Sequence, residues 1–314
     1  MGKQVSIMVA KFAYYCLVIP ISYLPLRILY LFTDFFYLLL ITVVPYRKKV
    51  IEGNIERSFP DKSKSERAKI KRQFYRHFCD LLAEGIKNLT ISKAALTSRF
   101  TVKNSEIMYL LYNQKKSVIL VSGHYNNWEW LITAQNFLFP HKAMGIGMPM
   151  TSKFWDKKIN ERRMRFGMKV IHSKNFREEI EKNSHHPVAV LTLGDQSPGD
   201  SSKSYWMDFL HQKTAVAFGT EMMAHQFNFA VVYFVTRKIK RGHYEMELFL
   251  ISDDPTKNAW GELTEAHTHK LESEIKANPQ FWIWSHKRWK REVPTDIETL
   301  RNEQKSKFEQ RFSK

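Results

Sequence analysis

The sequence predicts an α/β sandwich with a mainly parallel central sheet flanked by helices, together with an N-terminal membrane-associated helical segment. Short apolar runs alternate with helix-like stretches along most of the chain, which is the order expected of repeated βα units. Two of the apolar runs end at a glycine followed by polar residues, as strands do when they stop at one edge of a sheet. Residues 5–45 form a separate segment because they are strongly apolar and aromatic.

The N-terminal segment consists of two apolar pieces. Residues 12–26 and 28–44 contain about 15 and 17 residues, whereas a spanning helix needs about 20. Two half-length helices lying in or dipping into the membrane fit as well as one clean span, and a helical hairpin packed only on protein is the alternative. The basic run 47–49 stays on the cytoplasmic side under the positive-inside rule. We therefore predict a membrane anchor in residues 1–50 and a cytoplasm-facing domain in residues 51–314.

Helical and strand-like stretches follow the anchor. The apolar residues of 63–89 have helical spacing and indicate core packing, so His77 and Asp80 on this helix are not assigned a function. The expected strands are 118–121, 143–147, 188–193, 229–235 and 244–251. The expected helices between them are 126–138, 152–166, 176–183 and 216–227.

The composition limits the classes of partner. The 49 Lys and Arg against 31 Asp and Glu give a net charge of +18, which implies an anionic partner: nucleic acid, acidic lipid or a phosphorylated substrate. The cysteines, Cys16 and Cys79, lack the spacing of metal ligands, so we expect no disulfide framework, no metal site and no cofactor.

The first strand-end motif places a histidine where a sheet binds its ligands. The run 118–121 stops at Gly123, and His124 follows at the C-terminal rim. Asn126 or Asn127 can cap the next helix, and Glu129 in its first turn can reach back to one imidazole nitrogen. The other nitrogen would then act as a general base on a hydroxyl. The alternative is a loop histidine with local hydrogen bonds beside a surface glutamate.

A second motif repeats this geometry. The strand 188–193 ends at Gly194, and Asp195 and Gln196 follow at the same rim. Asp195 could position His124 or a substrate group, and Gln196 could donate to a carbonyl, although a plain turn explains Gly-Asp equally well. No serine or cysteine lies in a nucleophile-elbow or triad-like context, so direct attack without an acyl-enzyme is the simpler acyl-transfer mechanism.

Two basic stretches accompany these motifs. Arg163 and Arg165 lie two residues apart on the helix 152–166, so they do not share one face, and a solvated helix face is the ordinary explanation. Residues 281–291 interleave tryptophans with lysines and arginines, a pattern that suits an anionic membrane interface or single-stranded nucleic acid. The apolar N-terminus favours the membrane, and without a nucleic-acid-binding motif we expect no nucleic-acid partner. Some of these tryptophans are expected to fill the core.

Several of these blocks resemble one protein family. The segment from His124 to Glu129, His-Tyr-Asn-Asn-Trp-Glu, is similar to the H-x4-E signature of the lipid A late acyltransferases of bacteria, within the wider glycerolipid and lysophospholipid acyltransferase superfamily. Further blocks occur in the same order across roughly residues 20–292: Asn54-Ile-Glu-Arg-Ser-Phe-Pro60, Arg163-Met-Arg-Phe-Gly167, Gly194-Asp-Gln-Ser-Pro198, Trp206-Met-Asp-Phe-Leu210 and Trp284-Ser-His-Lys-Arg-Trp289. Asn-Trp-Glu-Trp after the histidine is most similar to Bacteroidetes members.

The resemblance implies a glycerolipid-acyltransferase-like fold and an acyl transfer. A fatty acyl chain would pass from a thioester, acyl carrier protein or acyl-CoA, to a hydroxyl of a phosphorylated glycolipid, most simply a lipid A precursor. His124 and Glu129 would form the general-base dyad. The implied substrate-binding residues are Arg163, Arg165, Asp195, Gln196 and Asn127, with at least one arginine over the strand ends holding a phosphate or polarising the acyl carbonyl.

The implied location is the cytoplasmic face of the bacterial inner membrane, in contact with anionic lipids. Two rival functions remain on the same scaffold: a lysophospholipid or aminolipid O-acyltransferase, and a non-enzymatic lipid-binding protein.

Overall fold

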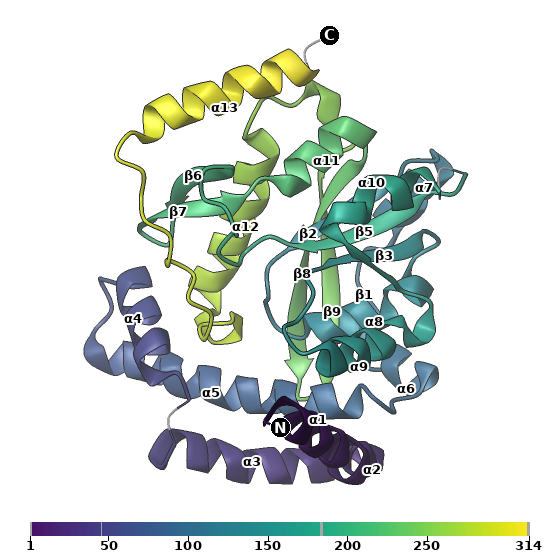
Figure 1. The fold of residues 1–314 in the computed structure, drawn as a ribbon, viewed down its shortest axis with the longest axis vertical. Helices are drawn as coiled ribbons and strands as arrows, with labels where there is room; N and C mark the ends of the chain where they lie inside the picture. The colour runs from purple at the N-terminus through teal and green to yellow at the C-terminus, as the bar shows by residue number, and fades with distance from the viewer. Residues whose placement is uncertain (1, 45, 183–184, 313–314) are drawn as a thin grey trace.

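A mixed, mostly parallel sheet of seven strands forms the centre of the protein (Figure 1). The computed structural model describes residues 2–44, 46–182 and 185–312. The strand order is β1-β9-β8-β2-β5-β3-β4, and β8 and β9 pair antiparallel while the other neighbours are parallel. The strands of this sheet are β1 (Phe100–Val102), β2 (Val118–Ser122), β3 (Lys142–Gly147), β4 (Lys169–His172), β5 (Val188–Leu193), β8 (Ala230–Lys240) and β9 (His243–Ser252). The predicted α/β class with a mainly parallel sheet is confirmed.

Helices surround the sheet on both faces. They are α1 (Gly2–Ala13), α2 (Ile19–Tyr23), α3 (Leu26–Thr42), α4 (Lys48–Ser58), α5 (Lys64–Lys87), α6 (Lys93–Thr97), α7 (Glu106–Asn113), α8 (Trp128–Leu138), α9 (Lys153–Arg163), α10 (Phe176–Glu181), α11 (Gly219–Phe227), α12 (Glu262–Ala277) and α13 (Ile297–Phe312). A π-helical turn, Tyr14–Val18, joins α1 to α2.

The alternation of side chains along β2 explains the two layers of helices. Val118 and Leu120 face the cluster that contains side chains of α7 and α8. Ile119 and Val121 face the opposite cluster, with side chains of α10, α11 and α12. Because β2 is buried on both faces, its sequence is a continuous apolar run rather than an alternating one.

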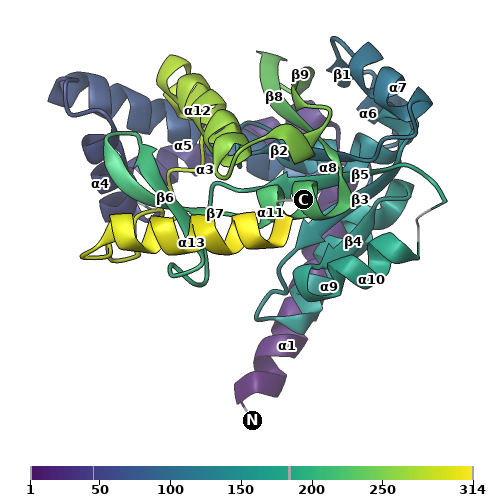
Figure 2. The same ribbon diagram turned by 90° about the horizontal axis from the view of Figure 1, so that it is seen from above.

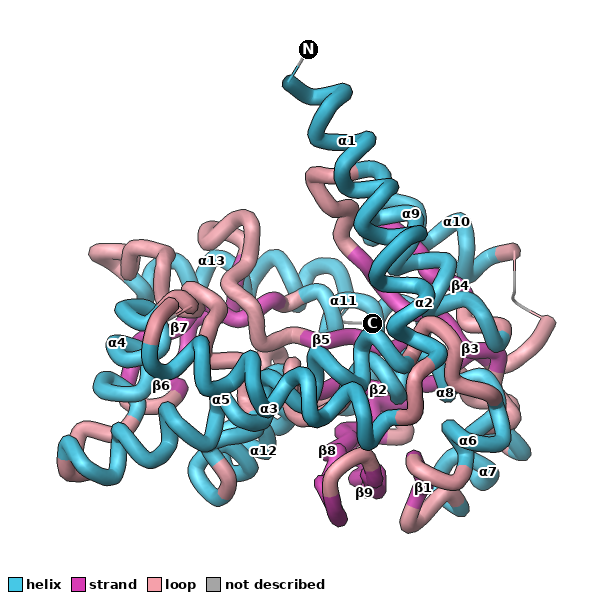
Figure 3. The backbone as a smooth tube through the Cα atoms, turned by 90° about the horizontal axis from the view of Figure 1, so that it is seen from below, coloured by secondary structure: helices cyan, strands magenta, loops and turns pink. Residues whose placement is uncertain are grey.

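The long helix α5 connects the sheet to the N-terminal segment. It begins at a capping box in which Ser63 accepts from the Glu66 N–H while the Glu66 carboxylate accepts from the Ser63 N–H. The helix predicted for this region is therefore confirmed. Seen from below, α3 runs beside α5 (Figure 3).

The N-terminal segment leaves much of its apolar surface exposed. Its two apolar pieces are separated between α2 and α3, before Leu26. Leu29 and Tyr30 of α3 are buried, whereas Leu31 and Phe35 on another face of this helix are 65% and 64% exposed. Figure 2 shows α1 projecting from the body of the molecule. None of the helices in the described ranges is both long enough and apolar enough to cross a membrane.

The structure departs from the sequence expectations in two regions. The helix expected over 216–227 begins only at Gly219, because residues before it form β7 (Gln212–Ala217), which pairs with β6 (Ser204–Phe209) in a separate hairpin. The helix α10 ends at Glu181, and residue 183 of the expected range lies outside the described residues. Of the aromatic and basic stretch 281–291, Trp282 and Trp284 are buried, which confirms that some of its tryptophans fill the core.

Candidate active site

The two strand-end motifs meet as the sequence predicts. β2 and β5 are parallel neighbours, and their last residues, Ser122 and Leu193, are partners in register. The Gly194 N–H then donates to the Ser122 carbonyl at 3.0 Å, which extends the pairing by one residue. A Cβ on Gly123 would lie only 2.9 Å from the carboxylate carbon of Asp195. Glycine is therefore required at this exit, because a side chain would push the two strand ends apart.

The contact between these strand ends pairs a histidine with an aspartate. His124 Nδ1 lies 2.6 Å from Asp195 Oδ1, and the His124 backbone N–H donates to Oδ2 at 2.8 Å. The indole N–H of Trp282 donates to the same Oδ2 at 2.8 Å. Burial alone would raise the pKa of Asp195, but its interactions with His124, and that hydrogen bond from Trp282, outweigh burial and hold the pKa below its usual range.

The ionised aspartate fixes the tautomer of the histidine. A carboxylate is only an acceptor, so Nδ1 carries the proton and Nε2 presents a lone pair. His124 Nε2 lies 3.3 Å from Nε2 of Gln196, whose amide N–H can donate to it. Gln196 is exposed, so an incoming hydroxyl could take the place of its amide. The pair His124 and Asp195 therefore has the geometry of a general base with its orienting carboxylate.

The expected contact between Glu129 and His124 is wrong. Arg162 Nη2 donates to Glu129 Oε2 at 2.5 Å, and Arg163 holds both carboxylate oxygens through its Nε and Nη2. The physical reason is competition: Asp195 already occupies Nδ1 of the histidine, and two guanidinium groups attract the carboxylate from the side of α9. The sequence spacing of five residues could not reveal either partner.

The two arginines also set the charge state of Glu129. Burial alone would raise its pKa, but Arg162 and Arg163 lower the pKa to about 2. Glu129 therefore stays ionised at neutral pH and holds two cations side by side near the start of α8. Its hydrogen bonds thus hold these two cations, and its interaction with His124 is electrostatic.

Arg163 and Arg165 have different surroundings. Arg163 reaches Glu129, at the start of the helix that follows His124. Arg165 instead donates to the carbonyls of Asn88 and Ile91, each at 2.6 Å, just beyond α5. The structure thus brings one of these two predicted residues to the site, and Arg165 is not brought there.

Asn127 holds the start of α8 in place. Its side-chain oxygen accepts from the Trp130 N–H at 3.0 Å, so the predicted helix cap is confirmed. Its amide donates to Glu84 at 2.6 Å, and Tyr30 and Tyr244 also donate to this carboxylate at 2.6 and 2.7 Å. Because both ends of the Asn127 amide are engaged, the geometry supports a positioning role better than substrate binding.

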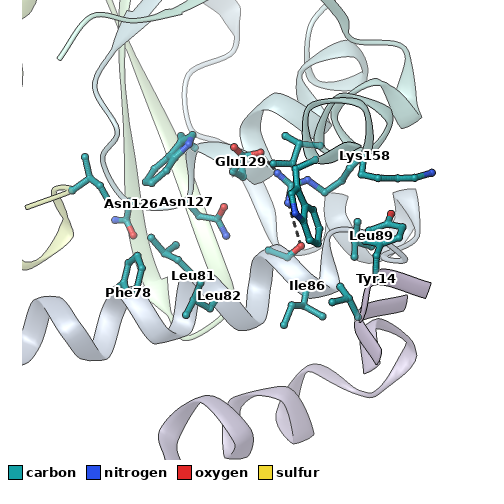
Figure 4. Close-up of a pocket in the computed structure, with 17 residues that line it drawn as sticks. Tyr14, Phe78, Leu81, Leu82, Ile86, Leu89, Asn126, Asn127, Glu129 and Lys158 are labelled. Atoms are coloured by element: carbon teal, nitrogen blue, oxygen red, sulfur yellow. Dashed lines mark hydrogen bonds and ion pairs between the residues drawn. The ribbon is translucent and has the colours of Figure 1, made fainter. Parts of the chain in front are cut away.

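An apolar cavity of about 370 Å³ lies beside this segment (Figure 4). Its wall includes Leu81, Leu82 and Ile86 of α5, and Tyr14 of the π-helical turn that joins α1 to α2. Glu129 and Arg162 supply polar groups to the lining. Trp128 also lines the cavity, and its ring lies 5.1 Å from the His124 imidazole in an edge-on contact. The cavity therefore adjoins the histidine through one aromatic side chain.

Three residues of this arrangement were not among the predicted site residues. In the sequence, Trp282 falls in the aromatic and basic stretch 281–291, Arg162 lies on the predicted helix 152–166, and nothing singles out Glu84. A charged residue within the apolar face of a long helix was the one signal that could have marked Glu84. Within the described ranges, no three His, Cys, Asp or Glu side chains gather as a metal site.

Comparisons with known proteins point to one family. Residues 3–291 match the family described as "Bacterial lipid A biosynthesis acyltransferase". The chain is also similar to the lipid A biosynthesis lauroyltransferase of Escherichia coli strain K12, with 24% identity over 247 residues, which are 78% of this chain and 79% of that protein.

Proposed function

The chain belongs to the bacterial lipid A biosynthesis acyltransferase family, and from this membership and the geometry of the site we propose its donor, its acceptor and its catalytic groups. The family implies an acyl donor and a lipid A precursor as acceptor. We take the donor to be an acyl thioester, with acyl carrier protein preferred to acyl-CoA because an acidic carrier suits a net charge of +18. The acceptor group is a hydroxyl of the phosphorylated glycolipid.

His124 acts as the general base. Its Nε2 takes the proton of the acceptor hydroxyl as the hydroxyl oxygen attacks the thioester carbonyl carbon. The tetrahedral intermediate then collapses, the carbon–sulfur bond breaks, and the thiolate leaves and receives the proton from the imidazolium. Asp195 stabilises that imidazolium and keeps its Nδ1 proton in place. The hydrogen bonds of Asp195 to His124 support this pairing in place of a dyad of His124 with Glu129.

Arg162 and Arg163 provide positive charge where the thioester oxygen becomes negative. Glu129 holds both guanidinium groups, and Arg162 also lines the apolar cavity. The Nε of Arg162 is buried and has no hydrogen-bond partner among the described residues, so this arginine keeps a donor in reserve. Cations fixed in advance stabilise a developing oxyanion without reorganising during the reaction.

The apolar cavity receives the fatty acyl chain. Its lining is dominated by apolar side chains from α5 and neighbouring helices, and its volume of about 370 Å³ lies in the range of small-molecule pockets. The polar groups of the lining, Glu129 and Arg162 among them, would then mark the carbonyl end of the chain.

The N-terminal segment holds the protein at the membrane. Members of this family are membrane-associated in bacteria. We propose that the exposed apolar face of α3, including Leu31, Phe32 and Phe35, lies in the bilayer interface of the inner membrane. Residues 1–50 would form the anchor, with residues 51–314 on the cytoplasmic face, and the basic residues 47–49 would contact anionic headgroups.

The observation that carries the proposal is the hydrogen bond from His124 to Asp195 at converging strand ends, beside an apolar cavity. The test is acyl transfer by the full chain in detergent, with a labelled acyl thioester and two acceptors, a lipid A precursor and a lysophospholipid. We expect transfer to the lipid A precursor and its loss in His124→Ala, by about 10²–10⁴-fold. Wild-type turnover by His124→Ala would refute the mechanism, and exclusive use of the lysophospholipid would refute the acceptor.

A further inference from the structure

A second cavity, of about 330 Å³, lies against another face of α5. Arg76, His77 and Asp80 line it from this helix, and Lys238 and Arg241 line it from the end of β8 and the turn that follows. Gln280 and Phe281 complete a wall. None of these residues takes part in the proposed transfer of the acyl group.

The charged groups of this cavity leave donors free for a ligand. Asp80 is fully occupied, because one oxygen accepts from Lys238 Nζ at 2.7 Å and the other from Arg241 Nε at 2.7 Å. Arg241 donates to Asp34 from its two terminal nitrogens, at 2.9 and 2.6 Å, and its Nη2 also lies 2.6 Å from Asp80 Oδ1. Lys238 has three donors, of which this contact uses one. The side chain of Arg76 is 62% exposed, and its ion pair with Asp34 is long, at 3.9 Å.

His77 is the independent sign of a ligand. Its side chain is buried, 4% exposed, and neither ring nitrogen has a hydrogen-bond partner among the described residues. Burial, and next the positive charge of Lys238, hold its pKa well below the usual range, so the imidazole is neutral and offers one N–H. A buried polar group without a partner is costly, and such groups occur where a ligand completes the hydrogen bonding. The sequence indicated only core packing for this helix.

We propose that this cavity binds a phosphate monoester. Three cations against two carboxylates leave the group of Arg76, Lys238, Arg241, Asp34 and Asp80 with a net positive charge. Free donors come from different elements: Arg76 and His77 from α5, and Lys238 from β8. A phosphate monoester has three terminal oxygens arranged tetrahedrally, so it can accept from several directions at once, whereas a carboxylate accepts in one plane.

The position of the cavity indicates two sources for this phosphate. Phe281 forms part of its wall, contacts the His77 ring at 4.8 Å, and accepts from the Asn126 N–H through its carbonyl. The cavity wall is thus hydrogen-bonded to the segment that carries His124, which makes the phosphate of a sugar whose hydroxyl lies at His124 the first source. Asp34, which holds Arg241, lies on α3 beside Phe35, so a phospholipid headgroup of the bilayer is the other source. The first source rests on the proposed function, and the second does not.

Binding of small phosphates by the full chain in neutral detergent tests the inference. Calorimetry would compare glucose 1-phosphate with glucose, and flotation would compare phosphatidylcholine vesicles with and without phosphatidic acid. The diagnostic variants are Arg76→Gln and His77→Phe, and Phe keeps a ring against Phe281 while removing both nitrogens. The matched control is Arg72→Gln, an exposed arginine one turn earlier on α5 that does not line the cavity.

We expect each diagnostic variant to weaken phosphate binding about tenfold or more and the control to leave it unchanged. Loss with glucose 1-phosphate assigns the cavity to a sugar phosphate, and loss confined to phosphatidic acid vesicles assigns it to a headgroup. The proposal is overturned if all variants bind phosphate like the wild type, or if the control loses as much binding as the two diagnostic variants. It is also overturned if the wild type binds neither glucose 1-phosphate nor phosphatidic acid vesicles. Thermal melting checks that His77→Phe is folded, and removal of unpaired buried nitrogens should not lower its melting temperature.

The failure of this proposal is distinguishable from that of the acyl transfer. The binding assay contains no acyl donor, so Asp195→Asn should bind glucose 1-phosphate like the wild type. An active enzyme without phosphate binding would refute only the cavity, and phosphate binding without acyl transfer would refute only the proposed function.

Discussion

Asp195 and Glu129 are both carboxylates close to His124 in the fold, yet their environments differ. Asp195 accepts from an imidazole, an indole and a backbone N–H. Glu129 accepts only from guanidinium groups, those of Arg162 and Arg163. A carboxylate that faces one histidine can orient a base, whereas a carboxylate that faces two arginines fixes positive charge. In the proposed mechanism, proton transfer therefore takes place at the sheet edge, and oxyanion stabilisation at the contact between α8 and α9.

The largest effect is expected at Asp195. In Asp195→Asn the side chain no longer fixes the proton on Nδ1, so Nε2 is no longer the dependable acceptor, and kcat should fall by about 10²–10⁴-fold. Initial rates at saturating donor and acceptor measure this loss, with circular dichroism as the check on folding. If the variant kept wild-type turnover, Asp195 would be a structural residue. The claim that it orients His124 as the base would then be refuted.

A double-mutant cycle sharpens the comparison at Glu129. Glu129→Gln should lower kcat, because Arg162 and Arg163 lose their shared partner. Combined with Arg163→Gln it should deviate from additivity by about 0.5–3 kcal/mol in activation free energy, since the two side chains interact directly. The double variant Glu129→Gln with Asp195→Asn should deviate less from additivity in activation free energy. Strong coupling of Glu129 to Asp195, with none to Arg163, would show that Glu129 acts on His124 rather than on the arginines.

Arg165 provides a contrast to Arg163 within the same helical region. Arg165→Ala removes hydrogen bonds to the carbonyls of Asn88 and Ile91, so the free energy of unfolding should fall by about 1–3 kcal/mol. Chemical denaturation measures that change. Activity on phosphorylated and dephosphorylated acceptors should stay in the wild-type ratio. A loss of activity confined to the phosphorylated acceptor would show that Arg165 binds the substrate.

The smallest effect concerns Glu84, a buried carboxylate that forms no ion pair within the part of the chain that the structure describes. Burial raises its pKa to about 7, and the hydrogen bonds from Tyr30 and Tyr244 only partly offset burial. The ordinary pKa of a glutamate is about 4.3. Because the folded pKa is raised, the contribution of Glu84 to stability is complete below the ordinary pKa and is lost as the pH rises through about 7.

The variant Glu84→Gln should therefore gain stability relative to the wild type between pH 5 and pH 8. Melting temperatures across that range measure the difference. Glu129 should behave oppositely, because its pKa of about 2 means that its contribution is present at neutral pH and is lost only in strong acid. A flat difference between wild type and Glu84→Gln would show that Glu84 is ionised throughout.

The local pattern of the sequence predicted much of the fold. Apolar runs of strand length predicted β2, β3, β5, β8 and β9 nearly to their ends, since burial on both faces makes such strands continuously apolar. The hairpin of β6 and β7 escaped notice because its partly polar residues lack that signal. The sequence predicted that some tryptophans of 281–291 fill the core but not which ones, because composition alone cannot distinguish a buried indole from an interfacial one.

The sequence by itself determined which chemical groups stand at the sheet edge. A glycine after each of two buried strands places His124 and Asp195 at the carboxyl ends of their strands, and the pairing of β2 with β5 makes these ends neighbours. Only the tertiary structure decided which carboxylate serves the histidine. Arg162 and Arg163 lie more than 30 residues from Glu129 along the chain, and the packing of α9 against α8 brings these charges together. Electrostatic partners are set by distance in space, which local sequence spacing does not specify.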